Sequence, residues 1–216
     1  PKSAPKSVTV TETEADIDDD DAFEVCTAVT KISDAALGVS HVPKENETVY
    51  AGSAPVKLMR ALAAGGEGVI YQTNTPYVAK IYKKEKLTKR RYEKIKRMLS
   101  HSFSCEGICY PVAALCNSKK EFVGYLMPKA KGKELQKSIF IKPLFLKNFP
   151  NWKKRDTVEL SITILKKIQY LHDKNIIMGD INPSNILVVS PKEVYFVDTD
   201  SYQIEDFPCP VGTVNY

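Results

Sequence analysis

Three side chains that carry oxygen atoms are grouped in the C-terminal part of the sequence. Asp180 and Asn185 lie in M-G-D-I-N-P-S-N, and Asp198 opens the D-T-D that follows. Amide and carboxylate oxygens, together with substrate phosphates, are the ligands that Mg²⁺ prefers, so Asn185 and Asp198 are candidate metal ligands. A further carboxylate, Asp180, can accept the proton of an attacking hydroxyl. This division of labour predicts a phosphoryl-transfer site.

A hairpin is needed to bring these residues together. N-I-L-V-V and V-Y-F-V-D are two β-rich runs joined by S-P-K-E, which places Pro191 in the turn. If Ser190 pairs with Glu193, the same register places Asn185 opposite Asp198. Cross-strand neighbours have Cβ atoms about 5 Å apart, so one metal ion could contact both side chains.

The motifs in this region resemble those of the protein-kinase family. M-G-D-I-N-P-S-N stands for the kinase H-R-D-x-K-x-x-N, and D-T-D stands for D-F-G. Upstream, A-A-A-G-G-E-G-V-I-Y and Y-V-A-K-I-Y are similar to the glycine-rich loop and to the strand that bears the ATP-binding lysine, here Lys80. The resemblance runs over residues 57–216, about three-quarters of the chain. It looks closest to divergent bacterial Ser/Thr kinases with a GGEG loop and a DTD motif, which implies ATP and Mg²⁺ as cofactors.

The resemblance also implies a set of ATP-binding residues. Lys80 would supply charge to the α- and β-phosphates, and a glutamate of the following helix would hold it; Glu93 fits best and Glu85 is the alternative. V-G-Y-L-M-P-K-A-K-G resembles the strand and hinge that offer backbone groups to adenine. The other residues implied at the ATP site are Gly65, Gly66, Gly68, Ile70, Val78, Met127, Pro128 and Ala130.

Several positions depart from the kinase pattern. Met178 and Gly179 replace His and Arg, which argues against activation through a phosphorylated loop. Asn182, placed in the catalytic loop, replaces a lysine near the transferred phosphoryl group, and an amide cannot neutralise charge there, so slow turnover is expected. Thr199 and Asp200 replace Phe and Gly after the metal-binding aspartate.

The elements that must position these residues follow from local patterns. A charged helix is predicted from about Glu85 to Leu99. I-C-Y-P-V-A-A-L-C and E-F-V-G-Y-L-M-P read as paired strands around the polar turn N-S-K-K. Asp156 with Glu159 predicts a capping box at the start of another helix.

Taken with the resemblance, these patterns predict an α+β, bilobal protein-kinase-like fold with a β-rich N-lobe and a helical C-lobe truncated after the activation segment. The predicted boundaries are a disordered acidic tail over residues 1–25, an N-terminal extension over 26–56, the N-lobe and hinge over 57–130, and a partial C-lobe over 131–216. C-P-V-G-T-V-N-Y, at the end of the chain, resembles the close of a kinase activation segment.

Composition narrows the possible partners. The net charge is +5, but residues 1–24 hold two lysines and eight acids, or −6, which leaves +11 on the remainder. The basic run 83–97 lacks interleaved aromatics and is expected to be a solvated helix face, so no nucleic-acid partner is predicted. No apolar run reaches the roughly 18 residues of a membrane span, so no membrane partner is expected and the cytoplasm is the expected location. The oligomeric state and the protein substrate stay unknown at this point.

Three functions are compatible with these features. The first is ATP- and Mg²⁺-dependent transfer to a Ser/Thr hydroxyl of a protein. The second is a pseudokinase that binds nucleotide or a partner without transfer, which Asn182 and the altered D-T-D favour. The third is a small-molecule kinase of the aminoglycoside or choline type, because G-D-x-N-P-x-N without lysine resembles that group also; the G-T-V-N-Y end argues against it.

Overall fold

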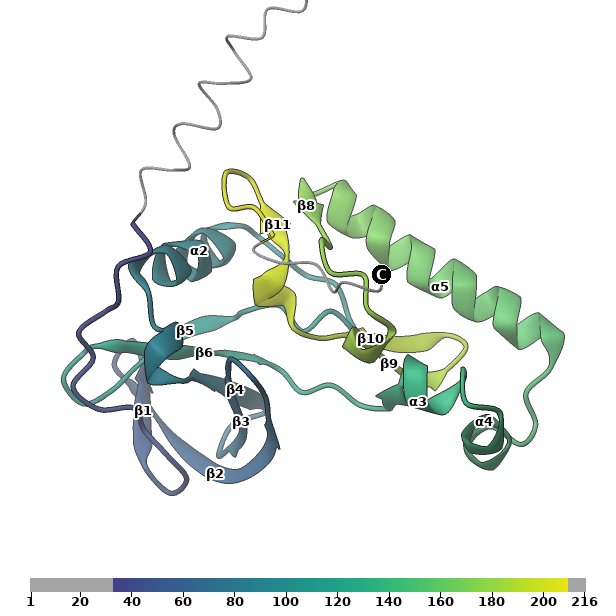
Figure 1. The fold of residues 1–216 in the computed structure, drawn as a ribbon, viewed down its shortest axis with the longest axis horizontal. Coiled ribbons are helices and arrows are strands. Elements are labelled where there is room, and N and C mark those ends of the chain that lie inside the picture. Colours follow the sequence, from purple (N-terminus) through teal and green to yellow (C-terminus); the bar gives the residue numbers. More distant parts are fainter. Residues whose placement is uncertain (1–32, 210–216) are drawn as a thin grey trace, which may run out of the picture.

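The computed structural model describes residues 33–209, and the first half of this range forms a closed antiparallel β-barrel (Figure 1). Hydrogen bonds join the strands in the order β1-β2-β3-β4-β6-β5. A single residue pair, Tyr50 with Cys116, connects β5 back to β1 and closes the barrel. The strands are β1 Thr48–Ala51, β2 Ala54–Ala64, β3 Gly68–Thr73, β4 Tyr77–Tyr82, β5 Ala113–Cys116 and β6 Phe122–Pro128.

The centre of the barrel wall is β4, which pairs with β3 on one side and β6 on the other. Its sequence, Y-V-A-K-I-Y, is buried at every position after the first. A strand covered on both faces has this nearly continuous apolar character, because neither face meets water. The one lysine in such a strand therefore requires a special environment.

Helix α2 (Lys89–Ser100) packs against the barrel through Ile95 and Met98, which are fully buried. It begins later than predicted, because the short 3₁₀ turn η1 (Lys84–Lys86) comes first. Thr88 caps its N-terminus: the Thr88 side chain accepts a hydrogen bond from the Arg91 backbone nitrogen at 3.2 Å. The cap sets where the helix begins, and the buried Ile95 and Met98 mark the face that packs on the barrel.

The second half combines helices with short strands. A three-stranded sheet has the order β10-β9-β7, and β11 pairs with β8. The helices are α3 Leu135–Ser138, α4 Lys142–Asn148 and α5 Lys154–His172, and 3₁₀ turns η2 (Pro183–Asn185) and η3 (Thr199–Ser201) flank the hairpin. The strands are β7 Lys133–Glu134, β8 Ile176–Ile177, β9 Ile186–Ser190, β10 Glu193–Phe196 and β11 Gln203–Ile204.

Helix α5 supports the hairpin from one side. It begins at Lys154, so Asp156 lies in its first turn and does not form the predicted cap with Glu159; Asp156 Oδ2 accepts the Lys153 backbone N–H at 2.7 Å. Further along, Thr163 Oγ1 donates to the Pro191 carbonyl at 2.8 Å, which ties the helix to the hairpin turn.

The predicted fold class, a bilobal kinase-like fold with a helical C-lobe, is wrong. The first half is a closed six-stranded barrel, and residues 33–209 contain four α-helices in all, three of which share the second half with five strands. Two physical reasons explain the error. Barrel closure depends on pairing between distant strands, which local periodicity does not encode, and strands of two residues are too short to show any period.

Two of the sequence predictions fall outside the described residues. They concern the acidic tail over 1–25 and the G-T-V-N-Y end. Among the described helices, none combines the length and the apolar character that crossing a bilayer requires.

Candidate functional site

The hairpin formed by β9 and β10 has the predicted turn but a different register. Ser190 pairs with Glu193 as expected. A β-bulge follows, and Val194 then pairs with Val188. A bulge of this kind opposes two residues of one strand to one residue of the other, so every later pair is shifted by one position.

The bulge separates Asn185 from its predicted cross-strand neighbour Asp198, so that prediction is wrong by one residue. Instead, the Val197 backbone nitrogen donates to the Asn185 carbonyl at 3.0 Å. Asp198 then takes a left-handed conformation, with φ +59° and ψ +38°, which ends the strand and starts η3. Aspartate is one of the few residues that tolerates this region, at a cost of about 1 kcal/mol. The side chains of Asn185 and Asp198 nevertheless line the same cavity.

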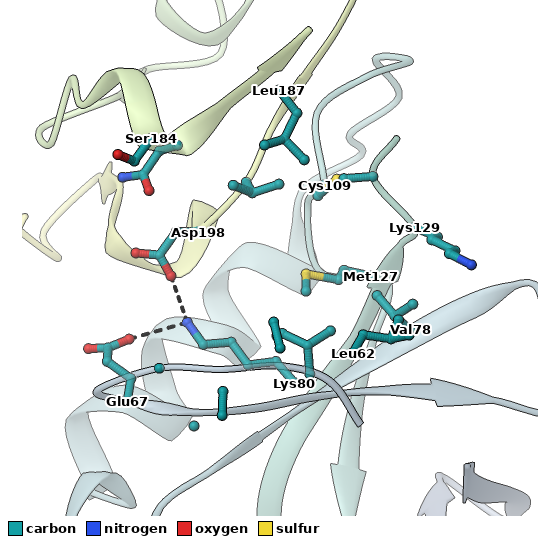
Figure 2. A pocket seen from close by; sticks show the side chains of 18 of the residues that line it. Leu62, Glu67, Val78, Lys80, Cys109, Met127, Lys129, Ser184, Leu187 and Asp198 are labelled. Atoms are coloured by element: carbon teal, nitrogen blue, oxygen red, sulfur yellow. Dashed lines mark hydrogen bonds and ion pairs between the residues drawn. The ribbon is translucent and has the colours of Figure 1, made fainter. Parts of the chain in front are cut away.

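That cavity, of about 650 Å³, lies where the barrel meets the hairpin (Figure 2). Sites for small molecules are commonly in the range of roughly 300–1,000 Å³. All but three of the predicted site residues line it, namely Gly65, Gly66, Gly68, Ile70, Val78, Lys80, Met127, Pro128, Ala130, Asn185 and Asp198. The three that do not are Glu93, Asp180 and Asn182.

The glycines of the loop between β2 and β3 have different reasons to be glycine. A Cβ atom on Gly68 would lie 2.3 Å from the Ile81 carbonyl oxygen, so the close approach of β3 and β4 excludes any side chain there. Gly65 and Gly66 have nothing within 4 Å of the corresponding position. Only these two keep open space beside the cavity, where backbone could approach a ligand.

The back wall of the cavity is made by β4 and β6. Val78 pairs with Met127 in this ladder, and both side chains are buried. Gly124 of β6 lies against β4 so closely that a Cβ atom would be 2.0 Å from the Lys80 carbonyl oxygen. This contact presses the two strands together at the lysine and fixes where its side chain starts.

Lys80 extends from β4 to the floor of the cavity, where its side chain is 6% exposed. Its Nζ lies 2.8 Å from Asp198 Oδ1 and 3.2 Å from Glu67 Oε2, the two contacts drawn in Figure 2. A third carboxylate is closer still, because Asp200 Oδ1 accepts a hydrogen bond from Nζ at 2.7 Å. The buried ammonium is therefore surrounded by three acids.

Asp200 is the most heavily bonded of these acids, and its side chain is 2% exposed. Besides Lys80, it accepts hydrogen bonds from the Tyr82 hydroxyl at 2.6 Å and the Tyr125 hydroxyl at 2.8 Å. Arg91 Nη1 lies 3.3 Å from its Oδ2. Donors from β4, β6 and α2 thus converge on one carboxylate, which satisfies a buried charge that would otherwise be costly.

The structure does not bring Glu93 to Lys80. Glu93 pairs with Lys96 at 3.0 Å along the helix surface. The residue of α2 that faces the site is Arg91, whose Nη2 lies 2.7 Å from Glu67 Oε1. At about 100° per residue, a position two residues later lies about 200° around the helix, which turns Glu93 away. The helix therefore supplies a cation to the cluster, and the loop and D-T-D supply the acids.

The pKa values within the cluster follow from this arrangement. Burial alone would raise the pKa of Asp200, but Lys80 and the other donors reverse the effect and hold it well below its usual value. Burial likewise would lower the pKa of Lys80, and the surrounding carboxylates raise it above its usual value instead. For Asp198, burial and the neighbouring Asp200 outweigh Lys80, so its pKa is raised. Asp198 is the acid of the cluster whose charge is least compensated.

Of the three predicted catalytic-loop residues, Asn185 alone lines the cavity. Asn185 Nδ2 donates to Asp180 Oδ2 at 3.3 Å, which links the candidate base to the candidate metal ligand. Asn182 has a structural task, because its Oδ1 accepts the Ser184 backbone N–H at 2.8 Å and caps η2. Neither Asp180 nor Asn182 lines the cavity itself.

Metal ligands are available at two overlapping places. Asn185 and Asp198 both line the cavity, and their amide and carboxylate oxygens are a donor set that suits Mg²⁺. Glu67, Asp198 and Asp200 also place one carboxylate oxygen each within 4.8 Å of the others. Lys80 lies between these three acids and balances part of their charge.

Sequence reasoning missed most of the cluster around the lysine. It did not identify Tyr82, Tyr125, Arg91, Glu67 or Asp200 as partners. One signal was present: Tyr82 follows Lys80 by two positions on a strand, so both side chains point to the same face. The second acid of D-T-D was a further signal, because Asp200 stands where the kinase pattern has glycine.

Comparison with known proteins points in one direction. No protein-family model matches the chain. It is 26% identical over 155 residues to "Protein kinase YegI" of Escherichia coli O157:H7, and 25% identical over 172 residues to "Protein kinase YegI" of Escherichia coli strain K12. These alignments cover 67% and 74% of this chain but only 23% and 26% of the relatives. The chain thus spans about a quarter of their length, and the similarity supports a distant kinase-like relationship.

Proposed function

We propose that this chain carries an ATP- and Mg²⁺-dependent phosphoryl-transfer site that acts on a Ser/Thr hydroxyl of a protein. The observation that carries the proposal is that Lys80, Asn185 and Asp198, from three separate elements, line one cavity of about 650 Å³. The distant similarity to proteins named as protein kinases supports the same class of reaction.

Each residue has a task that its surroundings allow. Bound ATP and Mg²⁺ would supply the phosphoryl group and neutralise part of its charge. Asp198 and Asn185 would hold the metal, and Lys80 would bind phosphate oxygens. Asp180 would orient the acceptor hydroxyl and accept its proton. The short contact from Asp200 to Lys80 would keep the ammonium in place while Asp198 turns to the metal.

A nucleotide-binding scaffold without transfer is the second candidate. It is favoured by Asn182, whose oxygen caps η2 and whose amide carries no charge to replace the usual lysine. The two candidates share nucleotide binding and differ in turnover.

Phosphate incorporation from labelled ATP separates the candidates. If the chain transfers phosphate, wild type incorporates label, Asp180→Asn binds ATP but incorporates at least tenfold less, and Asp198→Ala loses Mg²⁺-dependent binding as well. Asp206→Asn, a change of the same type at an exposed position, is the matched control. If all variants bind ATP but incorporate only background label, the chain is a nucleotide-binding scaffold. If wild type does not bind ATP, both candidate functions are excluded.

A further inference from the structure

A second cavity, of about 470 Å³, lies beside the Arg91–Asp200 contact, and both residues line it. Helix α2 forms one wall, and Phe207 to Cys209, which follow β11, form another. In Figure 1, α2 and β11 are neighbouring elements above the barrel. Asp200 and Arg91 of the Lys80 cluster line this cavity, but none of the residues that line the first cavity does.

Lys94 is the unusual residue in this cavity. It is 7% exposed, and it makes no hydrogen bond or ion pair with any residue of the described range 33–209. Buried charges are normally paired, because an isolated ammonium in a medium of low polarity is costly. Lys94 lines the open volume of the cavity, so an anion bound there could pair with it.

The neighbouring charges favour an anion as well. Lys86, Arg90 and Arg91 line the same cavity. Arg90 Nη1 lies 3.8 Å from Asp34 Oδ2, which is too far for a hydrogen bond. The N–H groups of Arg90 can therefore donate hydrogen bonds to a ligand. The acid Asp34 is 72% exposed and Glu85 is exposed too, so water screens both of them. The buried carboxylate of Asp200 also lines the cavity, but it already accepts hydrogen bonds from Lys80, Tyr82, Tyr125 and Arg91. Lys86, Arg90 and Lys94 then supply the positive charge of the lining.

We propose that this cavity is a binding site for a phosphate group, with Lys94 as the buried point charge and Arg90 as the guanidinium donor. Guanidinium forks match the oxygens of phosphate, while an ammonium serves as a compact charge behind them. The volume also has room for a phosphorylated side chain, so the group could be free phosphate or part of a peptide. Both sources present the same chemistry to these residues.

The titration of Lys94 agrees with this assignment. Burial lowers its pKa from 10.5 to about 8, while Asp200 and Cys209 act in the opposite direction and Arg91 adds to the lowering. Glu67 also raises the pKa of Lys94. The other charged side chains that line the cavity are Asp34, Glu85, Lys86 and Arg90. Lys94 is therefore charged at neutral pH, and an anion bound in the cavity would stabilise its charged form.

The test is a titration with inorganic phosphate, followed by thermal unfolding at constant ionic strength. Wild type should gain melting temperature with phosphate by linkage, and Lys94→Met should lose the response. Lys96→Met is the matched control, because Lys96 lies on the same helix but is half exposed and pairs with Glu93. Arg90→Gln, a change at a partly exposed position, should weaken phosphate binding at least tenfold. It provides a second test of the site if Lys94→Met does not fold.

Two outcomes would overturn the proposal: no response of wild type, or an equal response of Lys94→Met. Phosphate could also bind at Lys80, so Lys80→Met is included; loss of the response there, with Lys94→Met unchanged, would assign the phosphate to the first cavity. This site does not depend on the proposed function, because Lys80→Met should abolish ATP binding yet keep the phosphate response. Repeating the titration with O-phosphothreonine in a short peptide identifies the source: tighter binding than inorganic phosphate indicates a phosphorylated side chain, and weaker binding indicates the free ion.

Discussion

The ammonium nitrogen of Lys80 is closer to Asp200 than to Asp198, at 2.7 Å against 2.8 Å, and Asp200 is the more deeply buried of the two acids. The second acid of D-T-D therefore provides the lysine with its fixed partner. Asp198, at 39% side-chain exposure, stays accessible from the cavity. This relationship assigns different tasks to two aspartates that are separated by a single residue.

Removing the charge of Asp200 should destabilise the fold. Asp200→Asn keeps the shape of the side chain but leaves Lys80 with one fewer buried carboxylate, and breaking a buried ion pair costs about 3–5 kcal/mol. Urea unfolding at pH 7 measures the loss of unfolding free energy. Asp206→Asn is exposed and should stay within about 0.5 kcal/mol of wild type. An Asp200→Asn protein as stable as wild type would show that the pair is not structural.

Arg91 and Glu93 should behave in opposite ways. Arg91→Ala removes the contacts to Glu67 and Asp200, so we expect weaker ATP binding, by about tenfold for a loss near 1.4 kcal/mol. Glu93→Ala removes only the surface pair with Lys96, which is worth about 0.3–0.5 kcal/mol and does not touch the cavity. Calorimetric titration of both variants with ATP·Mg²⁺ makes the comparison. A larger loss of ATP affinity in Glu93→Ala than in Arg91→Ala would support Glu93 as the partner of Lys80.

Adding one methyl group should separate the two kinds of glycine. Gly124→Ala places a Cβ atom against the Lys80 carbonyl, so the strands must move apart and the cost should exceed about 2 kcal/mol. Gly65→Ala meets open space and should change stability by less than about 1 kcal/mol. Thermal unfolding of both variants checks the contrast. Similar losses of stability in Gly124→Ala and Gly65→Ala would show that the close contact between β4 and β6 does not exclude a side chain at position 124.

The buried Lys94 should make stability depend on pH in the alkaline range. Its folded pKa, about 8, lies below the ordinary 10.5, so folding disfavours its charged form. The cost is present in full below pH 8 and is relieved as the pH rises toward 10.5. In phosphate-free buffer at pH 7, Lys94→Met should therefore be more stable than wild type by on the order of 3 kcal/mol, from 1.36 kcal/mol per pKa unit.

The difference in stability between Lys94→Met and wild type should shrink between pH 8 and 10.5, because Lys94 loses its proton in this range. Lys96→Met, altered at a half-exposed residue of the same helix, should show no such change with pH. A difference between wild type and Lys94→Met that stays constant over this range would contradict the assigned burial of charge.

Local patterns in the sequence were enough to locate the parts of the site but not the way they meet. The hairpin turn was predicted because Ser190 and Glu193 flank a proline, and the pairing of those two residues is confirmed. The bulge beside it was not predicted, since an extra residue in one strand leaves the alternation of side chains locally plausible. The register error of one residue came entirely from this bulge.

The partner of Lys80 and the fold class could not be predicted for a common reason. Both depend on contacts between residues far apart in the chain: Lys80 and Asp200 are 120 positions apart, and β1 closes the barrel on β5. A helical period indicates which side chains share a face, but not which face turns toward the barrel. In the structure the face that carries Ile95 and Met98 packs on the barrel, and Arg91 instead of Glu93 reaches the lysine cluster.

Closure of the barrel has a consequence for how the molecule comes apart. A closed sheet has no free edge that could recruit another chain. Here the last joint is one residue pair, Tyr50 with Cys116, while the other neighbouring strands share longer ladders. Thermal fluctuations should open this seam before any other part of the wall, and its amides should exchange with deuterium first. Once open, β1 and β5 become edges, so the narrowest joint in the barrel is also where self-association would begin.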